Sequence, residues 1–196
     1  MALEPVLDGV WRWRWFSEEK GMDFNGWALA LPAGLAVVDP AWADEATWEV
    51  LAGLGAPAGI LLTNKDHERA SDELRLRLGT EVWAHAEEAP LLAVPPGQTF
   101  ADGERLFGAL ETVRLRGLKS PAECALHWPA RRLLLVGDAV AGHPPGGLGL
   151  VKKHQGRPEV LDGLRRLLDL DFDVLLVGDG QPLLVGAKDA LRRFLG

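Results

Sequence analysis

The sequence has few of the residues that mark several classes of protein. Among its 196 residues one is a cysteine, Cys124, and none is a tyrosine. A single cysteine excludes a disulfide framework and a zinc site built from cysteines. No apolar run approaches the roughly 18 residues that span a bilayer, and the N-terminal residues lack the pattern of a signal peptide. We therefore expect a cytoplasmic protein without a membrane partner.

Positive charge is also in short supply. Lys and Arg number 21 against 28 Asp and Glu, so the formal net charge is −7. This balance argues against nucleic acid as a partner, because binding its backbone needs clustered Lys and Arg. We expect a small-molecule substrate or ligand instead, and a homo-oligomer stays open. The low content of Met and Asn fits a thermophilic or GC-rich source.

The residues that are present suit one layered α/β domain. Apolar residues make up 47% of the chain, and no low-complexity linker divides it, so we expect a single domain over residues 1–196. Alternating patterns and short apolar runs predict strands at residues 10–16, 26–31, 34–39, 59–63, 81–85, 112–115, 124–128, 132–136 and 174–177. Helical spacing predicts helices at residues 43–54 (with Asp44 as N-cap), 71–78, 158–170 and 187–195.

Tryptophan alternates with arginine in the first predicted strand. Trp11, Trp13 and Trp15 therefore share one face of that strand. Two interpretations follow: the aromatic face packs on a helix, or it forms the rim of a pocket.

Polar residues follow four of the predicted strands. Asp39 ends one strand, a charged loop from Asn64 to Arg69 follows the next, and the near-copies LLLVGD and LLVGDG end in Asp138 and Asp179. Each Gly-Asp pair alone is typical of a turn. In layered α/β sheets, however, ligands bind beyond the carboxyl ends of strands, so Asp66, Asp138 and Asp179 are expected to converge. Three such carboxylates need a cation between them, or one of them must keep its proton.

Several segments, in their order along the chain, resemble the metallo-β-lactamase superfamily. They are the strand ending in Asp39-Pro40, ILLT leading into a polar loop, EVWAH, RLRGLKSPAECALHW, LLLVGDAV and LLVGDG. The resemblance covers nearly the whole chain. It implies an α/β (α+β) fold, a four-layer αββα sandwich with the active site at one edge between the sheets. It also implies a hydrolase-like protein.

The same resemblance implies a degenerate metal site. Members generally bind one or two metals, often zinc, through a His-x-His-x-Asp-His loop, two later histidines and a bridging Asp. Asp138 matches the bridging Asp, whereas the later histidine positions fall on Lys119 and Asp179. Two registers of the loop stay open. One anchors on Thr63 and puts Asn64, Asp66, Glu68 and Arg69 at ligand positions; the other makes Asp66-His67 the last two motif residues after a two-residue deletion.

These replacements change the expected cofactor. A protonated lysine cannot ligate a metal, but it can pair with carboxylates in the space of one. We therefore expect no cofactor, with Lys119 paired to Asp66, Asp138 and Asp179. The alternative is one divalent ion on those three carboxylates, with Mg, Mn or Ca favoured over zinc because the donors are oxygens.

Two hypotheses for function remain, and whether the chain is an enzyme stays open. In the first it is a hydrolase with a rebuilt site: His67 is the general base, Lys119 or Arg69 stabilises the oxyanion, and a carboxylate such as Asp138 orients the histidine. Lys65, Arg69 and His143 are then candidate substrate-binding residues. In the second, a non-catalytic module binds an anionic small molecule or a protein partner in the former active-site cleft. The substrate is not indicated.

Overall fold

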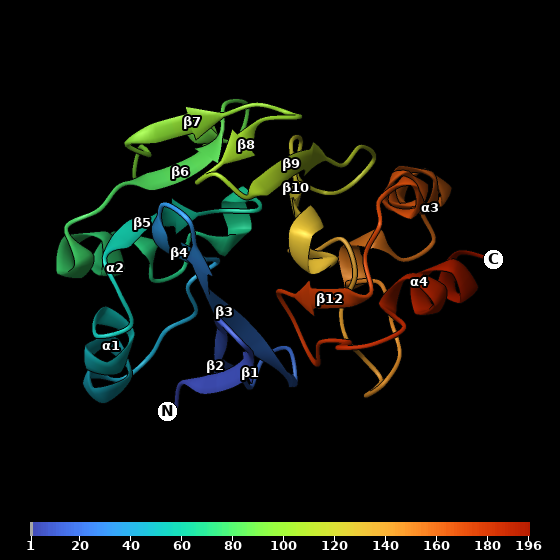
Figure 1. The fold of residues 1–196 in the computed structure, drawn as a ribbon. Coiled ribbons are helices and arrows are strands. Elements are labelled where there is room, and N and C mark those ends of the chain that lie inside the picture. The colour runs from blue at the N-terminus through green and yellow to red at the C-terminus, as the bar shows by residue number, and fades with distance from the viewer. Residues whose placement is uncertain (1) are drawn as a thin grey trace.

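Two β-sheets packed face to face form the centre of the molecule, with helices on both outer faces (Figure 1). The computed structural model describes residues 2–196. The larger sheet has the strand order β1-β2-β3-β4-β5-β6-β7, and the smaller has the order β12-β11-β10-β9-β8. The layers confirm the four-layer αββα sandwich expected from the sequence.

The larger sheet is antiparallel from β1 to β4 and parallel from β4 to β7. Its strands are β1 (Glu4–Leu7), β2 (Val10–Ser17), β3 (Met22–Leu31), β4 (Gly34–Val38), β5 (Pro57–Leu61), β6 (Val82–His85) and β7 (Gln98–Phe100). In the smaller sheet only the β11–β12 pair is parallel. Its strands are β8 (Arg105–Leu106), β9 (Leu110–Arg114), β10 (Cys124–Trp128), β11 (Leu133–Val136) and β12 (Val174–Val177).

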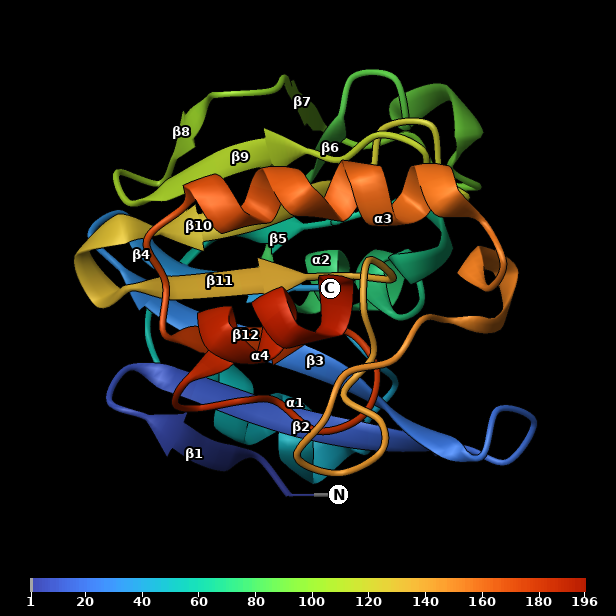
Figure 2. The same cartoon turned by 90° about the vertical axis from the view of Figure 1, so that its right-hand side faces the viewer.

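The helices lie on the outer faces in pairs. α1 (Glu45–Ala52) and α2 (Ser71–Leu78) cover the larger sheet, and α3 (Pro158–Arg165) and α4 (Ala187–Leu195) cover the smaller one (Figures 1 and 2). Asp44 caps α1 by accepting the backbone N–H of Thr47, as the sequence predicts. The predicted helix at 158–170 is shorter than expected, because its last turn, Arg166–Asp169, is a 3-10 helix. Within residues 2–196, no helix is both long and apolar enough to cross a membrane.

Three apolar clusters fill the spaces between the four layers. The central cluster joins the two sheets through side chains such as Leu29, Leu61, Leu126 and Leu135. A second cluster lies between the smaller sheet and its helices, and a third lies between the larger sheet and α1 and α2. Because burial of apolar surface is the main favourable term in folding, these clusters fix how the strand ends of one sheet face those of the other.

The tryptophans of β2 divide between the two interpretations drawn from the sequence. Trp13 is fully buried, packs edge-to-face on Trp48 of α1 with ring centroids 5.7 Å apart, and donates its indole N–H to the carbonyl of Ala41. Trp15 instead contacts Trp42 and Phe24, with centroids 4.9 and 5.7 Å away. The strand therefore packs on a helix at Trp13 and supports an aromatic cluster at Trp15.

Buried hydrogen bonds join the two sheets near the site. The side-chain amide of Asn25, on β3, donates to the carbonyls of Val177 (2.8 Å) and Gly180 (2.9 Å), and Trp27 donates its indole N–H to Val177 (3.1 Å). These bonds hold the end of β12 against the larger sheet, so the residues that follow β12 have a fixed place.

Replacing Asn25 tests this connection. Asn25→Ala removes the amide donor of the Gly180 carbonyl and leaves the Val177 carbonyl with the Trp27 indole N–H, so we expect the free energy of unfolding to fall by about 2 kcal/mol. Urea unfolding measures the difference. Gln98→Ala removes an exposed amide from β7 and is the matched control. Equal stabilities for the two variants would contradict the proposed role of Asn25.

Candidate functional site

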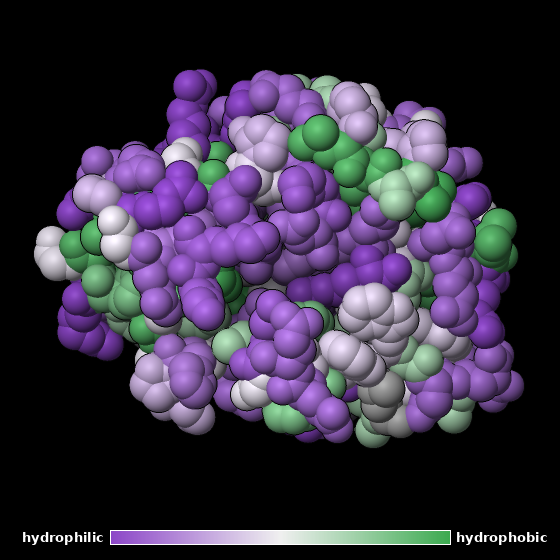
Figure 3. Space-filling model, turned by 180° about the vertical axis from the view of Figure 1, so that it is seen from behind, coloured by the Kyte–Doolittle hydropathy of each residue, from purple (hydrophilic) through white to green (hydrophobic). Residues whose placement is uncertain are grey.

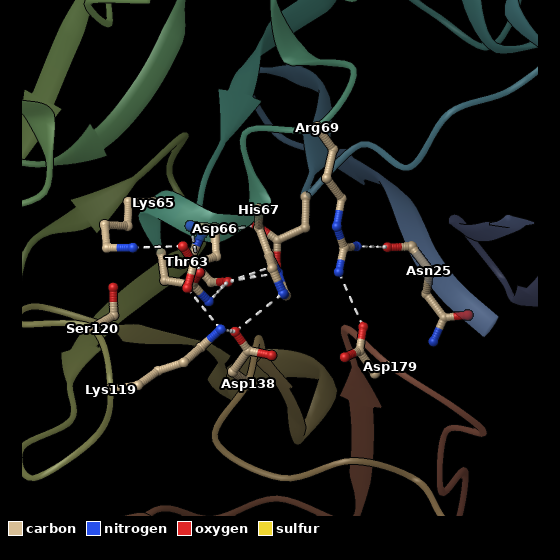
Figure 4. A network of polar contacts seen from close by, with 12 residues as sticks. Asn25, Thr63, Lys65, Asp66, His67, Arg69, Lys119, Ser120, Asp138 and Asp179 are labelled. Atoms are coloured by element: carbon tan, nitrogen blue, oxygen red, sulfur yellow. Dashed lines mark hydrogen bonds and ion pairs between the residues drawn. The ribbon is translucent and has the colours of Figure 1, made fainter. Parts of the chain in front are cut away.

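The polar residues predicted to converge come together where the strands of both sheets end. The loop after β5 supplies Asp66, His67 and Arg69, and the residues after β11 and β12 supply Asp138 and Asp179 (Figure 4). In Figure 2 the arrow of β11 points to this edge of the molecule. Figure 3 shows the same edge face-on, with hydrophilic side chains across its middle.

The ammonium group of Lys119 lies between carboxylates that belong to different sheets. Its Nζ is 2.7 Å from Asp66 and 2.5 Å from Asp138, and its side chain is only 17% exposed. Burial lowers the pKa of Lys119, but Asp138 and Asp66 outweigh that effect and raise it. Lys119 is therefore a fixed positive charge at neutral pH.

His67 is held between two further carboxylate contacts. Its Nδ1 is 2.8 Å from Asp39 and its Nε2 is 3.6 Å from Asp138. Burial and the charge of Arg69 act to lower the pKa of His67, but Asp39 and Asp138 prevail and raise it to about 10. The imidazole is thus protonated at neutral pH, with a carboxylate on each side.

Asp179 pairs with Arg69 and not with Lys119. The guanidinium donates to Asp179 (3.0 Å) and to the carbonyl of Asn25 (3.3 Å), and it lies 4.4 Å from the ring centroid of Phe24. The sequence-based expectation that Lys119 would pair with all three carboxylates is therefore wrong for Asp179, because Arg69 reaches it first across the gap between the sheets. Burial raises the pKa of Asp179 although His67 and Arg69 act to lower it.

Steric contacts explain why a glycine precedes each of the two aspartates Asp138 and Asp179. A methyl group on Gly137 would lie 2.2 Å from the Thr63 hydroxyl, and one on Gly178 would lie 2.5 Å from the His67 ring. Both glycines therefore let the ends of β11 and β12 approach the loop after β5. The aspartates that follow them are brought to the site by this close approach.

Two candidate binding residues lie away from the centre of the site. Lys65 pairs with Asp66 at 2.5 Å on the side away from the pocket lining. His143 is exposed in the loop after β11 and does not line the pocket. The structure therefore brings together Asp66, His67, Arg69, Lys119, Asp138 and Asp179, but not His143.

The residues of the two motif registers divide between the pocket lining and contacts within the loops. Asp66 and His67 face the pocket, whereas the side chain of Asn64 accepts the N–H of Asp66 and Glu68 accepts those of Ala93 and Val94. Arg69, a ligand position of the register anchored on Thr63, lines the pocket as well, so each register has two of its positions there.

Four buried residues of the site were not among the sequence-based candidates. Asp39 accepts the N–H (2.8 Å) and hydroxyl (2.6 Å) of Thr63, in addition to its contact with His67. Glu88 accepts hydrogen bonds from the hydroxyl of Ser120 and the backbone N–H of Ala122, and so fixes the loop that carries Lys119. His154 accepts the N–H of Lys119 at 3.0 Å.

The fourth is Glu123. It is fully buried, and within residues 2–196 neither carboxyl oxygen has a hydrogen-bond partner. Burial, reinforced by the charge of Asp138, raises the pKa of Glu123 well above its ordinary value. Its position in the motif segment, next to Cys124, was the only sequence signal that pointed to it.

A pocket of about 530 Å³ opens over these residues. Phe24, Trp42, Met22 and Val151 supply its apolar lining. Its charged lining consists of Lys20, His67, Arg69, Lys119, Lys152 and Lys153, with Glu19, Asp66, Asp138 and Asp179. With His67 protonated, positive groups outnumber carboxylates here, on a chain whose net charge is −7.

Comparison with known proteins agrees with this geometry. The family model described as the metallo-beta-lactamase superfamily matches residues 6–195. The chain belongs to the metallo-β-lactamase superfamily. No curated protein matches the chain.

Solved structures of other superfamily proteins share the fold. A metallo-beta-lactamase from Pontibacter korlensis superposes with a TM-score of 0.77 at 18% identity, covering 99% of this chain and 96% of that one. One from Hirschia baltica gives 0.74 at 16% identity, covering 99% and 95%. A family protein from Thermus thermophilus gives 0.71 at 20% identity, covering 97% and 79%.

The site does not fit the metal centre that superfamily membership implies. Within the described residues, no three His, Cys, Asp or Glu side chains are grouped so as to hold a metal ion. Asp66 and Asp138 are engaged by the ammonium of Lys119, and Asp179 by Arg69. His67 has both ring nitrogens on carboxylates and carries a proton where a metal ligand needs a free lone pair.

The raised pKa of His67 predicts how His67→Gln alters stability with pH. Because the folded pKa of about 10 lies above the ordinary 6.5, the ion pairs of His67 contribute fully below pH 6.5 and less as the pH rises toward 10. The gap in unfolding free energy between wild type and variant should narrow over that range. Urea titrations at several pH values measure it, with the exposed His143→Gln as control. A gap that stays constant or widens would contradict the assignment.

Proposed function

We propose that this chain binds a small organic anion in the pocket over the Lys119 cluster, as a non-catalytic module of its superfamily. The observation that carries the proposal is the excess of positive charge in the pocket lining of an otherwise acidic chain. An anion is attracted to such a cleft because low-dielectric walls focus the local field.

Lys152 and Lys153 are the cations best placed for the ligand. Both are exposed at the pocket, and in the part of the chain the structure describes neither has a carboxylate within ion-pair distance. The inner cations Lys119 and Arg69 are already paired with carboxylates. The outer lysines therefore supply the uncompensated charge.

The apolar lining suits a ligand with a flat apolar part. Trp42 is 42% exposed and Phe24 lines the same pocket, and Trp15 contacts both rings. Aromatic side chains supply large contact areas at little entropic cost. A volume of about 530 Å³ is in the range of small-molecule pockets. The ligand class we propose is thus a carboxylate or phosphate that carries an aromatic or other apolar group.

The hydrolase hypothesis is less well supported by the same contacts. A general base must be unprotonated at the working pH, whereas the two carboxylates beside His67 raise its pKa to about 10. Lys119 and Asp138 form an ion pair, so neither charge is available to a substrate. The roles of His67 as base and of Lys119 as oxyanion stabiliser would both require these pairs to open.

Binding of naphthalene-2-carboxylate, followed by tryptophan fluorescence, tests the proposal. We expect saturable binding, weaker by about fivefold in the double variant Lys152→Gln/Lys153→Gln, because each exposed charge contributes a fraction of a kcal/mol. Arg193→Gln removes an exposed charge from α4 and should leave affinity unchanged.

Trp42→Leu should also weaken binding, with the exposed Phe16→Leu outside this pocket as its control. The neutral naphthalene-2-carboxamide should bind less tightly than the acid. The proposal fails if wild type shows no saturable binding of naphthalene-2-carboxylate, or if the double variant Lys152→Gln/Lys153→Gln binds it as tightly as wild type.

A further inference from the structure

We infer that the ammonium group of Lys119 is the resident counter-ion of this site and occupies the place of the divalent cation that the superfamily would lead one to expect. The inference goes beyond the binding of an organic anion and does not depend on it. It concerns the charge that holds Asp66 and Asp138 together, which come from loops of different sheets (Figure 4).

The geometry around Lys119 is that of a bridging cation. One Nζ contacts a carboxylate oxygen of Asp66 at 2.7 Å and one of Asp138 at 2.5 Å. Two carboxylates this close together need a positive charge between them, since otherwise one of them would take up a proton. The pKa of Asp66 and that of Asp138 are instead both lowered: burial acts to raise them, and the neighbouring cations outweigh it.

Four cations balance the four aspartates of the cluster without any added ion. Each of the carboxylates Asp39, Asp66, Asp138 and Asp179 has a cationic partner, and the cations are Lys65, His67, Arg69 and Lys119. Two further acids of the site are Glu123, which is buried without a hydrogen-bond partner in the described chain, and Glu88, which accepts the hydroxyl of Ser120 and two backbone N–H groups. A divalent ion would add two positive charges to four carboxylates that already have cationic partners.

Buried contacts hold Lys119 in this place, unlike a lysine on an open surface. The backbone N–H of Lys119 donates to Nε2 of His154, which is fully buried. The next residue, Ser120, donates to Glu88, which is 1% exposed and also accepts the N–H of Lys65. The loop carrying Lys119 and the loop carrying Asp66 are thereby fixed to the same buried carboxylate.

Removing the ammonium should convert the cluster into a cation site. In Lys119→Ala, Asp66 and Asp138 lose the ammonium group that they share, and Lys65 and His67 are the cations that remain beside them. The carboxylate oxygens that this change frees are donors that Mn²⁺ and Mg²⁺ prefer. We expect the Tm of this variant to fall by about 5–10 °C and to recover partly in Mn²⁺. Wild type should show no change of Tm in Mn²⁺ or EDTA.

The experiment combines metal analysis with Mn²⁺ titration. Native mass spectrometry of wild type, purified from metal-supplemented medium, should show the mass of the metal-free chain. Electron paramagnetic resonance of free Mn²⁺ should detect saturable binding to Lys119→Ala at least tenfold tighter than to wild type. Lys119→Ala/Asp138→Asn should lose this binding, and Arg193→Ala, an exposed charge on α4, should behave as wild type.

The inference is overturned if wild type retains a bound metal or if its Tm falls in EDTA. It is also overturned if Lys119→Ala is as stable as Arg193→Ala, or if it folds and does not bind Mn²⁺. The wild-type measurements decide the matter alone if Lys119→Ala does not fold. None of them involves an organic anion, so failure here is distinct from failure of the proposed function.

Discussion

The contact between the Lys119 ammonium and Asp138 is the interaction on which the site depends. Asp138 follows β11 of the smaller sheet, and the same ammonium reaches Asp66, which follows β5 of the larger sheet. Arg69 and Asp179 form a second pair across the same gap. The sheets are joined in their interior by apolar packing, and at this edge by charges that must stay matched, because an unpaired buried charge is costly.

This matching also limits what the site can do chemically. Carboxylates that already have cationic partners are poor proton acceptors, and an imidazole held between two of them keeps its proton. A reaction at these groups would require their ion pairs to open. Binding of an anion requires only the unpaired lysines at the edge of the pocket. In this chain, the ionisable groups at the centre of the site are thus partners of one another.

Much of the site could be predicted because strand ends are recognisable. Short apolar runs that end in polar residues place Asp66, Asp138 and Asp179 at one edge, and the motif order adds Lys119. The contacts of Lys119 with Asp66 and Asp138 were predicted, whereas the partner of Asp179 was not, since it depends on loop conformation. Arg69 reaches Asp179 from a backbone with φ of 37°, a region that non-glycine residues seldom adopt. Buried supports such as Glu88 and His154 have no periodicity or motif to mark them. Of the strands, β1, β7 and β8 were missed because they lack the continuous apolar run that marks the equally short β11 and β12.

The central claim is that Lys119 is protonated and that its ammonium group pairs with carboxylates next to both sheets. Nitrogen-15 NMR of the lysine side chains tests it directly in the unaltered protein. The account predicts an ammonium signal from Lys119 that persists at neutral pH with slow proton exchange, because the group is paired and largely buried. A Lys119 signal that exchanges as fast as those of exposed lysines would contradict it.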